Sequence, residues 1–377
     1  MSTDGTHGGL DQPTQLREWG TDRVHVLPPP EAALCYLSTQ GDALRLSASK
    51  PAFVHAYLRS LRGTWRISQG MHGVVLRENN VPCREFSLIP GSEVHLGSRV
   101  LIAESPRWIA LRAFCCRILG WGDSRVVDRA LRSISSASRF GLPLVLRGGN
   151  GLPSIAFALH QRILGEEHPF ALCDKHGGGV SRSLRPFPRF SRALDALNAA
   201  AGGTLCLASG YRPADEPMLL EQLHSGTRPL QLVVCIKGEH RIGALVGPVP
   251  ITIPSLNLRR GDVGRIIDAY AQEARAALNA PPWCFSEYDA QWVANHESSL
   301  LPEMEKAIWR FTTINLVFGN VAAAKRLLGI AYISLRRWLH QRRRWQSAVA
   351  RGVVTRRRQA SLRRCEDDLN ARSADGG

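Results

Sequence analysis

The segment 319–339 reads GNVAAAKRLLGIAYISLRRWL and places apolar residues at helical spacing on both sides of Gly329. Asn320 is a favoured N-cap residue, because its side chain can accept hydrogen bonds from the first free amides of a helix. Gly329 can end that helix, because glycine adopts the left-handed conformation without a side-chain clash. We therefore predict one helix over about 321–328 and a second from about Tyr332, joined by a tight turn.

Each of the two expected helices has an apolar face and a polar face. The side chains expected to pack between them are Val321, Ala324, Leu327 and Leu328 in the first helix and Ile333, Leu335 and Leu339 in the second. The side chains expected to face outward from the second helix are Tyr332, Ser334, Arg336 and Arg337. Such a pair is a helix-turn-helix with a cationic outer face, which favours DNA binding. An ordinary helical hairpin on a protein surface is the alternative.

The pattern GNVxxAxxLLGIxxxxLxxxL resembles the Fis-type helix-turn-helix that closes bacterial sigma-54-dependent activators. The resemblance implies a DNA-binding domain over 281–345, in which residues 300–318 form a scaffold or dimer-forming helix. Its partner would be DNA, bound by a homodimer or higher oligomer with recognition helices in successive major grooves. Arg336 and Arg337 are assigned to phosphates or guanine edges. The full set of residues assigned to DNA contact is Asn320, Tyr332, Ser334, Arg336, Arg337, His340 and Arg343.

The charge of the chain supports a polyanionic partner. The formal net charge is +16 and the sequence pI is near 10.1, and arginines cluster in the last fifth of the chain. Arginine runs lie at 342–344, 356–358 and 363–364. We predict a basic disordered tail over 346–377 that attracts phosphates without sequence preference. A solvated tail without a function is the alternative.

The length of 377 residues predicts two or three domains. Residues 1–30 are polar and rich in turn formers, which predicts a flexible leader and no secretory signal. No stretch approaches the roughly 20 continuous apolar residues that span a bilayer, so we expect no membrane partner and a cytoplasmic, nucleoid-associated protein. The nine cysteines lack metal-ligand spacing and are expected to be reduced, buried thiols without a disulfide or a metal site.

Residues 31–105 contain short apolar alternations separated by turn formers, which predicts a small antiparallel β-sandwich. The segment 86–97, FSLIPGSEVHLG, resembles the end of a forkhead-associated domain. The resemblance implies a phosphothreonine site made by a Gly-Arg strand end and a Ser-x-x-His loop. Residues 68–72 carry the residue types of that loop, but in the wrong place and at the wrong spacing. We therefore expect a forkhead-associated-like sandwich that does not bind phosphopeptides and is available to a protein partner. Phosphothreonine binding is the alternative.

In the middle of the chain, the pattern of apolar residues changes at about residue 106 and again at about residue 141. Residues 106–140 hold two runs with apolar residues at helical spacing, which predicts a helical linker. From 141 to about 280, short apolar runs of strand length alternate with helical patterns, which implies a buried parallel sheet with covering helices. The predicted fold class is multidomain α and β, with a β-sandwich, an α/β parallel sheet and a C-terminal α-helical helix-turn-helix.

The segment 148–154, GGNGLPS, follows a predicted strand and leads into a helix, which is the place of a phosphate-binding P-loop. Gly148 and Gly151 fit the glycines of that motif. Pro153 stands where the last glycine is needed, and Ser154 stands where a lysine neutralises the outer phosphates. Proline removes an amide and serine supplies no charge, so the loop has lost the chemistry of the motif.

Residues 202–209, GGTLCLAS, resemble the GGTLFLDE strand of the sigma-54 activator ATPase, which has an AAA+ fold. Ala208 and Ser209 replace the aspartate that organises the metal and the glutamate that activates water. Residues 253–263 resemble the following IPPLRER segment, in which Arg259 keeps the second arginine. The resemblance implies an AAA+-like frame without its catalytic residues. The degenerate nucleotide-site positions are Gly148, Gly151, Ser154, Ala208, Ser209 and Arg259.

These residues predict an inactive ATPase fold over 141–280, with no catalytic residue and no cofactor, and they leave weak ATP binding open. Residues 174–200 contain nothing like the GAFTGA loop through which the activators contact sigma-54. The first hypothesis is a sequence-specific DNA-binding transcriptional regulator related to sigma-54-dependent activators. One alternative is a protein-interaction adaptor, acting through the sandwich or the ATPase-like domain, with nonspecific nucleoid binding. Another is a nucleotide-binding sigma-54 activator.

Overall fold

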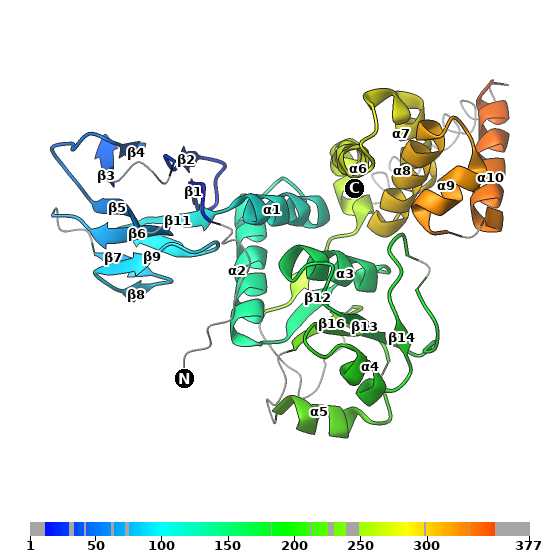
Figure 1. Ribbon diagram of the computed structural model, residues 1–377, viewed down its shortest axis with the longest axis horizontal. Helices are drawn as coiled ribbons and strands as arrows, with labels where there is room; N and C mark the ends of the chain where they lie inside the picture. The colour runs from blue at the N-terminus through cyan, green and yellow to red at the C-terminus, as the bar shows by residue number, and fades with distance from the viewer. Residues whose placement is uncertain are drawn as a thin grey trace, which may run out of the picture. The chain divides into compact units, whose positions relative to one another are not determined.

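The computed structural model describes residues 12–29, 34–40, 43–61, 64–71, 75–181, 183–211, 213–224, 230–238, 249–297, 299–330 and 332–350 (Figure 1). Two compact units make up the chain: residues 1–262 with 300–302, and residues 263–299 with 303–377. The first unit contains a β-sandwich, two helices that follow it and a parallel α/β sheet. The second unit is helical.

Two antiparallel sheets form the β-sandwich of the first unit. Its strands are β1 (Gln15–Glu18), β2 (Val24–Val26), β3 (Leu34–Gln40), β4 (Ala43–Ser47), β5 (Ala56–Leu61), β6 (Thr64–Gln69), β7 (Leu76–Glu78), β8 (Val81–Pro82), β9 (Glu85–Ser87), β10 (Glu93–Leu96) and β11 (Arg99–Glu104). One sheet has the order β2-β1-β11-β10-β7-β8 and the other has the order β4-β3-β5-β6-β9.

Both sheets contribute to one apolar core. Alternate side chains along the strands point into this core. In β6, Trp65 and Ile67 are buried, whereas Arg66 between them is exposed. Leu16 in β1 and Leu101 in β11 fill the same core from the other sheet. The prediction of an antiparallel sandwich is therefore confirmed.

The first two strands lie in the segment predicted to be a flexible leader. Strand β1 pairs with β11, and β2 pairs with β1. The predicted leader over 1–30 is therefore wrong for residues 15–18 and 24–26. The apolar pattern of β1 is weak, because Leu16 is its one apolar residue and its other buried side chain is the charged Arg17.

Helices α1 (Pro106–Leu119) and α2 (Ser124–Phe140) follow the sandwich, in agreement with the helical pattern of the sequence. The side chain of Ser105 caps α1 by accepting from the amide of Trp108 at 3.1 Å. Asp123 caps α2 in the same way.

A parallel sheet forms the remainder of the first unit. Its strands are β12 (Leu144–Arg147), β13 (Phe170–Cys173), β14 (Arg189–Phe190), β15 (Thr204–Leu207), β16 (Gln231–Ile236) and β17 (Ile251–Thr252). Their order is β14-β13-β15-β16-β12-β17, and each of these neighbours pairs in parallel. The predicted buried parallel sheet is confirmed.

Helices cover both faces of this sheet. They are α3 (Leu152–Ile163), α4 (Ala193–Ala199) and α5 (Glu216–His224), with the short helix η1 (Leu256–Asp262) after β17. Val145 of β12 shares a core with Ala196 of α4, whereas its neighbour Leu144 lies with Leu159 of α3. Figure 1 shows α3 and α4 on opposite faces. Strand β12 lies between β16 and β17, so the strand order reverses at this place in the sheet. Such switch points are where α/β sheets bind ligands.

The second unit is built from α6 (Val263–Leu278), η2 (Pro282–Cys284), α7 (Glu287–His296), α8 (Leu301–Leu316), α9 (Val321–Leu328) and α10 (Tyr332–Ala350). An aromatic cluster forms its centre. The ring of Phe311 in α8 is fully buried and lies 5.3 Å from the ring of Trp292 in α7 and 4.6 Å from the ring of Trp338 in α10. The helix predicted over 300–318 is present as α8.

Candidate functional site

Helices α9 and α10 occupy the segment in which the sequence predicts two helices and a turn. The side-chain oxygen of Asn320 accepts from the amides of Ala322 and Ala323, at 3.1 Å each. Gly329 ends α9 with a φ of +63°. The predicted N-cap, the glycine stop and the start of α10 at Tyr332 are confirmed.

The buried face of these helices differs from the predicted one. Ile333, predicted to be buried, is 70% exposed, and Leu327 is 55% exposed. Val321 and Leu339 are half-buried. The predicted members that are buried are Ala324, Leu328 and Leu335. The difference arises because α10 packs against α8 as well as α9.

Three residues at a spacing of three and four, Leu335, Trp338 and Arg342, hold α10 in place, and we call them the anchor spine. Leu335 and Trp338 are buried. The guanidinium of Arg342 lies 4.5 Å from the centre of the Phe311 ring and donates to Asp289 at 2.5 Å. The sequence signal for this spine is an i, i+3, i+7 spacing that includes one aromatic and one charged residue.

Arg342 belongs to an arginine run that the sequence assigns to nonspecific phosphate attraction. Its side chain is ion-paired with Asp289, which is almost fully buried. Asp289 also accepts from Ser286 at 2.8 Å and from Asn315 at 3.1 Å. Arg342 is therefore part of the scaffold. Helix α10 also continues to Ala350, past the predicted start of the tail, and the remaining tail residues lie outside the described part of the chain.

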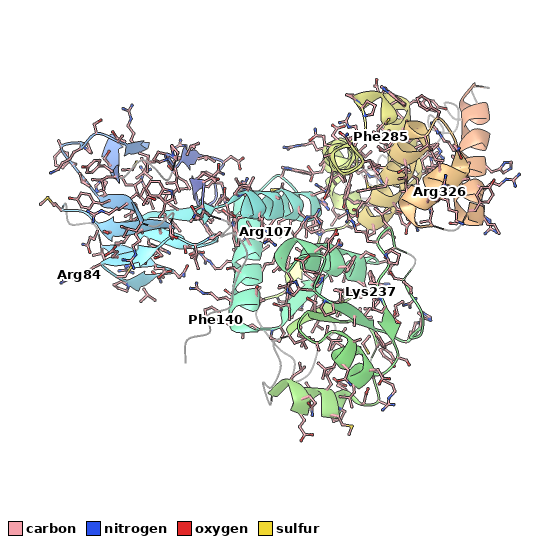
Figure 2. All side chains as sticks on the ribbon, in the orientation of Figure 1. Arg84, Arg107, Phe140, Lys237, Phe285 and Arg326 are labelled. Atoms are coloured by element: carbon pink, nitrogen blue, oxygen red, sulfur yellow. The ribbon has the colours of Figure 1, made fainter. Side chains whose placement is uncertain are left out.

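Opposite the anchor spine, the helices expose basic side chains that we call the basic face. Its members are Lys325, Arg326, Arg336, Arg337 and His340. Figure 2 labels Arg326 on α9. Within the described residues, none of these five side chains forms an ion pair. Tyr332 and Ser334 are exposed on the same helix, whereas the side chain of Arg343 lies outside the described set.

The phosphate-binding frame lies at the carboxyl end of β12, at the switch point of the sheet. Gly148 packs so closely on strand β17 that a Cβ there would lie 3.1 Å from the carbonyl oxygen of Ile253. Gly151 has a φ of +91° at the start of α3. Position 151 thus favours glycine because of its backbone conformation, whereas at position 148 a side chain would only be crowded.

The loop itself is short. Helix α3 begins at Leu152, so its first turn already contains Pro153 and Ser154. The amide of Ser154 donates to the carbonyl of Gly151 at 3.1 Å and is not available to a phosphate. Pro153 has no amide to offer, so two of the amides that a P-loop would use to bind an anion are lost at this connection.

The neighbouring strand ends offer no free carboxylate pair among the described residues. Ala208 and Ser209 follow β15 and are half-buried. Asp174, which the sequence reasoning did not weigh, follows β13 at the same edge. It accepts two hydrogen bonds from Arg189, at 3.0 and 2.6 Å, so its charge is already neutralised.

Two basic residues, Arg259 and Lys237, have different surroundings. Arg259 donates to the carbonyl of Arg117 at 2.8 Å and lies 4.0 Å from Asp262, so its contacts tie η1 to the end of α1. Lys237 follows β16 directly and is exposed (Figure 2). The sheet order brings it to the same edge as the loop after β12, a proximity that spacing in the sequence could not reveal.

The described residues contain no metal centre, no membrane-spanning helix and no disulfide. No group of three or more His, Cys, Asp or Glu side chains could hold a metal ion. No helix combines the length and the apolar character needed to cross a membrane. The described cysteines are free thiols, and all but Cys83 are buried. Burial raises the pKa of the Cys115 and Cys116 thiols, which keeps them protonated and unreactive.

Comparisons with known proteins give remote similarities. No sequence model of a known family matches the chain, and no curated protein matches it. Among solved structures, the chain is similar to an FHA domain studied for phosphothreonine-dependent interactions, with 20% identity over 24% of this chain and 93% of that chain and a TM-score of 0.19. It is similar to the FHA domain of FhaA, solved with the intracellular domain of Rv3910, with 18% identity over 23% of this chain and 96% of that chain and a TM-score of 0.19. The crystal structure of NtrX from Brucella abortus in complex with ATP shares 13% identity over 57% of this chain and 67% of that chain, with a TM-score of 0.34.

Proposed function

We propose that the chain is a sequence-specific DNA-binding transcriptional regulator related to sigma-54-dependent activators, with an ATPase-like domain that does not hydrolyse ATP. The observation that carries the proposal is the basic face of α9 and α10. The anchor spine holds α10 on one side, and the side chains of the basic face form no ion pair among the described residues. Such side chains can approach phosphates and base edges without first breaking internal ion pairs.

The inactivity of the ATPase-like domain rests on its missing chemical groups. The loop after β12 has its Ser154 amide engaged and no lysine. The end of β15 carries Ala208 and Ser209 where a metal site and a base are needed, and Asp174 is already paired with Arg189. Without a carboxylate for magnesium or for the attacking water, phosphoryl transfer lacks its main electrostatic support.

DNA binding is tested with the full-length protein by selection from a random duplex library, followed by fluorescence anisotropy at fixed salt. We expect one enriched site and a loss of about 10- to 100-fold in affinity in the R336A/R337A variant, since a good arginine contact contributes about 1–3 kcal/mol. Arg84→Ala, an exposed arginine on the sandwich (Figure 2), is the matched control. No enriched site, or equal affinity in all three proteins, would contradict the proposal. If the variants bound DNA with equal affinity and a protein partner still bound to R336A/R337A, the result would favour a protein-interaction adaptor.

ATP hydrolysis is tested by phosphate release from the full-length protein with magnesium. We expect no release above that of the K237A variant, which removes the exposed lysine at the carboxyl edge of the sheet. Turnover of about one per second or more, an ordinary enzymatic rate, would refute an inactive frame.

A further inference from the structure

A cleft of about 720 Å³ lies in the first unit, and its lining includes no residue of the loop after β12. Five segments line it: the turns before β8 and before β10 of the sandwich, the first half of α1, the second half of α2 and the end of α3. This volume falls in the range of about 300–1,000 Å³ that small-molecule sites occupy. We call it the arginine cleft.

The charge of this cleft is unbalanced. Its arginines are Arg107, Arg132, Arg139 and Arg162, and Glu93 is the one carboxylate among its lining residues. Glu93 is bound by both Nε and Nη2 of Arg132, at 2.5 and 2.8 Å, so its charge is neutralised within the wall. The remaining positive charge favours a ligand that carries several negative charges.

Two of the four guanidinium groups, those of Arg132 and Arg162, are held in place before any ligand arrives. Arg132 is oriented by Glu93 and lies over the ring of Trp19 at 4.2 Å. Arg162 lies 4.2 Å over the ring of Phe114 and donates to the carbonyl of Ala158. These contacts make Arg132 and Arg162 fixed parts of the wall of the cleft.

Aromatic and apolar groups form the other part of the wall. The indole of Trp108 packs so tightly on Gly91 that a Cβ there would lie 2.5 Å from the ring, which fixes the indole in place. Phe140, at the end of α2, is 68% exposed beside Arg139. Figure 2 labels Arg107 on α1 and Phe140 on α2. A flat aromatic ligand can therefore stack on one part of the cleft while its charged groups meet the other.

We propose that the arginine cleft binds a nucleoside di- or triphosphate. The phosphates would meet Arg107 and Arg139, which form no ion pair among the described residues, and the base would lie against Phe140 and Trp108. This charge pattern fits the several negative charges of the phosphates, and the aromatic wall fits the base. The site is separate from the loop after β12 and does not depend on DNA binding. A ligand there would contact the sandwich and the helices α1, α2 and α3 at once.

The test is equilibrium dialysis of the full-length protein with radiolabelled ATP up to about 1 mM, with pyrophosphate as a competitor. We expect saturable binding, competition by pyrophosphate and a loss of at least about tenfold in affinity in the R107Q/R139Q variant. These arginines are exposed and form no described ion pair, so the variant should fold. R129Q, an exposed arginine on the same helix α2 outside the cleft, should bind like the wild type.

Further variants separate this site from the others. F140A should weaken ATP binding without changing the affinity of the protein for pyrophosphate. R336A/R337A should bind ATP normally, so a failure of DNA binding leaves this result unaffected. The proposal is overturned by no ATP binding at about 1 mM, by wild-type affinity in R107Q/R139Q, or by a loss caused by K237Q and not by the cleft variants.

Discussion

A buried histidine links helix α3 to the parallel sheet. The Nε2–H group of His160 donates to the carbonyl of His168 at 3.0 Å, so Nδ1 accepts from the hydroxyl of Thr204 at 2.9 Å. Both ring nitrogens are thus satisfied by the neutral tautomer. Burial lowers the pKa of His160 below its ordinary value, because the imidazolium form would lose its hydration.

This pKa predicts a pH dependence of stability. Below about pH 6.5, the ordinary histidine pKa, the unfolded chain takes up a proton that folded His160 does not. The free energy of unfolding should therefore fall as the pH is lowered from about 7, and should stop falling from this cause below the folded pKa. The expected slope is at most about 1.4 kcal/mol per pH unit. Urea unfolding at several pH values measures it.

The control for that experiment is a second histidine in the same unit. His160→Gln should remove this part of the pH dependence, whereas His176→Gln, an exposed histidine, should keep it. Equal slopes in wild type and H160Q would show that another group titrates in this window.

Ile333 is an exposed apolar residue in the first turn of α10, on the same side as Arg336, Arg337 and His340, which follow it at helical spacing. If α10 enters a major groove, such a side chain would contact a thymine methyl group. We predict that replacing one thymine of the selected site by uracil weakens wild-type binding by about fourfold, roughly the 0.8 kcal/mol of one buried methyl-sized group. Anisotropy titrations with each thymine replaced in turn provide the measurement.

A double-mutant comparison decides whether Ile333 makes that contact. Ile333→Ala should bind the thymine and uracil sites with equal affinity, whereas Leu327→Ala, another exposed apolar residue, should keep the wild-type difference. The same uracil penalty in I333A would assign the methyl contact to another residue.

At this scale, sequence rules worked where the cause is local. Asn320 and Gly329 act on the backbone within one turn of their own position, so their residue types predict their roles. The orientation of Ile333 and the burial of Trp338 depend on α8, which lies elsewhere in the sequence. Periodicity alone could not decide between a helix that packs on one neighbour and a helix that packs on two.

Among the elements, α10 depends most on a charged contact. Arg342 reaches Asp289 of α7 from the far end of the anchor spine, and the Asp289 side chain is 1% exposed. We predict that Arg342→Met, which keeps the apolar stem and removes the charge, lowers the free energy of unfolding by about 2–4 kcal/mol, because Asp289 loses its cation. Urea unfolding of the full-length protein, followed by tryptophan fluorescence, measures this loss.

Gln341→Met is the matched change at the neighbouring exposed position and should stay within about 0.5 kcal/mol of the wild type. If Arg342 were a phosphate contact only, R342M would be as stable as the wild type and would instead reduce the salt dependence of DNA binding by about one charge.

The parallel sheet was predictable at the element scale because β12, β13 and β15 are short, mostly apolar and separated by helices. Strand β1 was not, because it has one apolar residue and pairs with β11 from the other end of the sandwich. Likewise, the sequence predicts a degenerate phosphate loop, but the nearness of Lys237 and the pairing of Asp174 with Arg189 follow only from the strand order and the fold.

Across the first unit as a whole, one buried ionic network joins the sandwich to α2. Arg17 of β1 donates to Glu104 of β11 at 2.7 Å and to Asp128 of α2 at 2.5 Å. The amide of Gly20 also donates to Asp128, at 2.7 Å. All three charged side chains are almost fully buried. The domain boundary that the sequence predicts between residues 105 and 106 therefore separates two elements that this buried network joins.

We predict that Arg17→Met lowers the free energy of unfolding by about 3–5 kcal/mol, because it leaves two buried carboxylates without their cation. Since one of them belongs to α2, the sandwich and α2 should lose stability together. Hydrogen exchange of the full-length protein should then increase both in β11 and around Leu131, a fully buried residue of α2. Arg23→Met, an exposed arginine near β2, should change neither segment. Faster exchange confined to the sandwich would mean that it unfolds independently of α2, as the boundary predicted from the sequence implies.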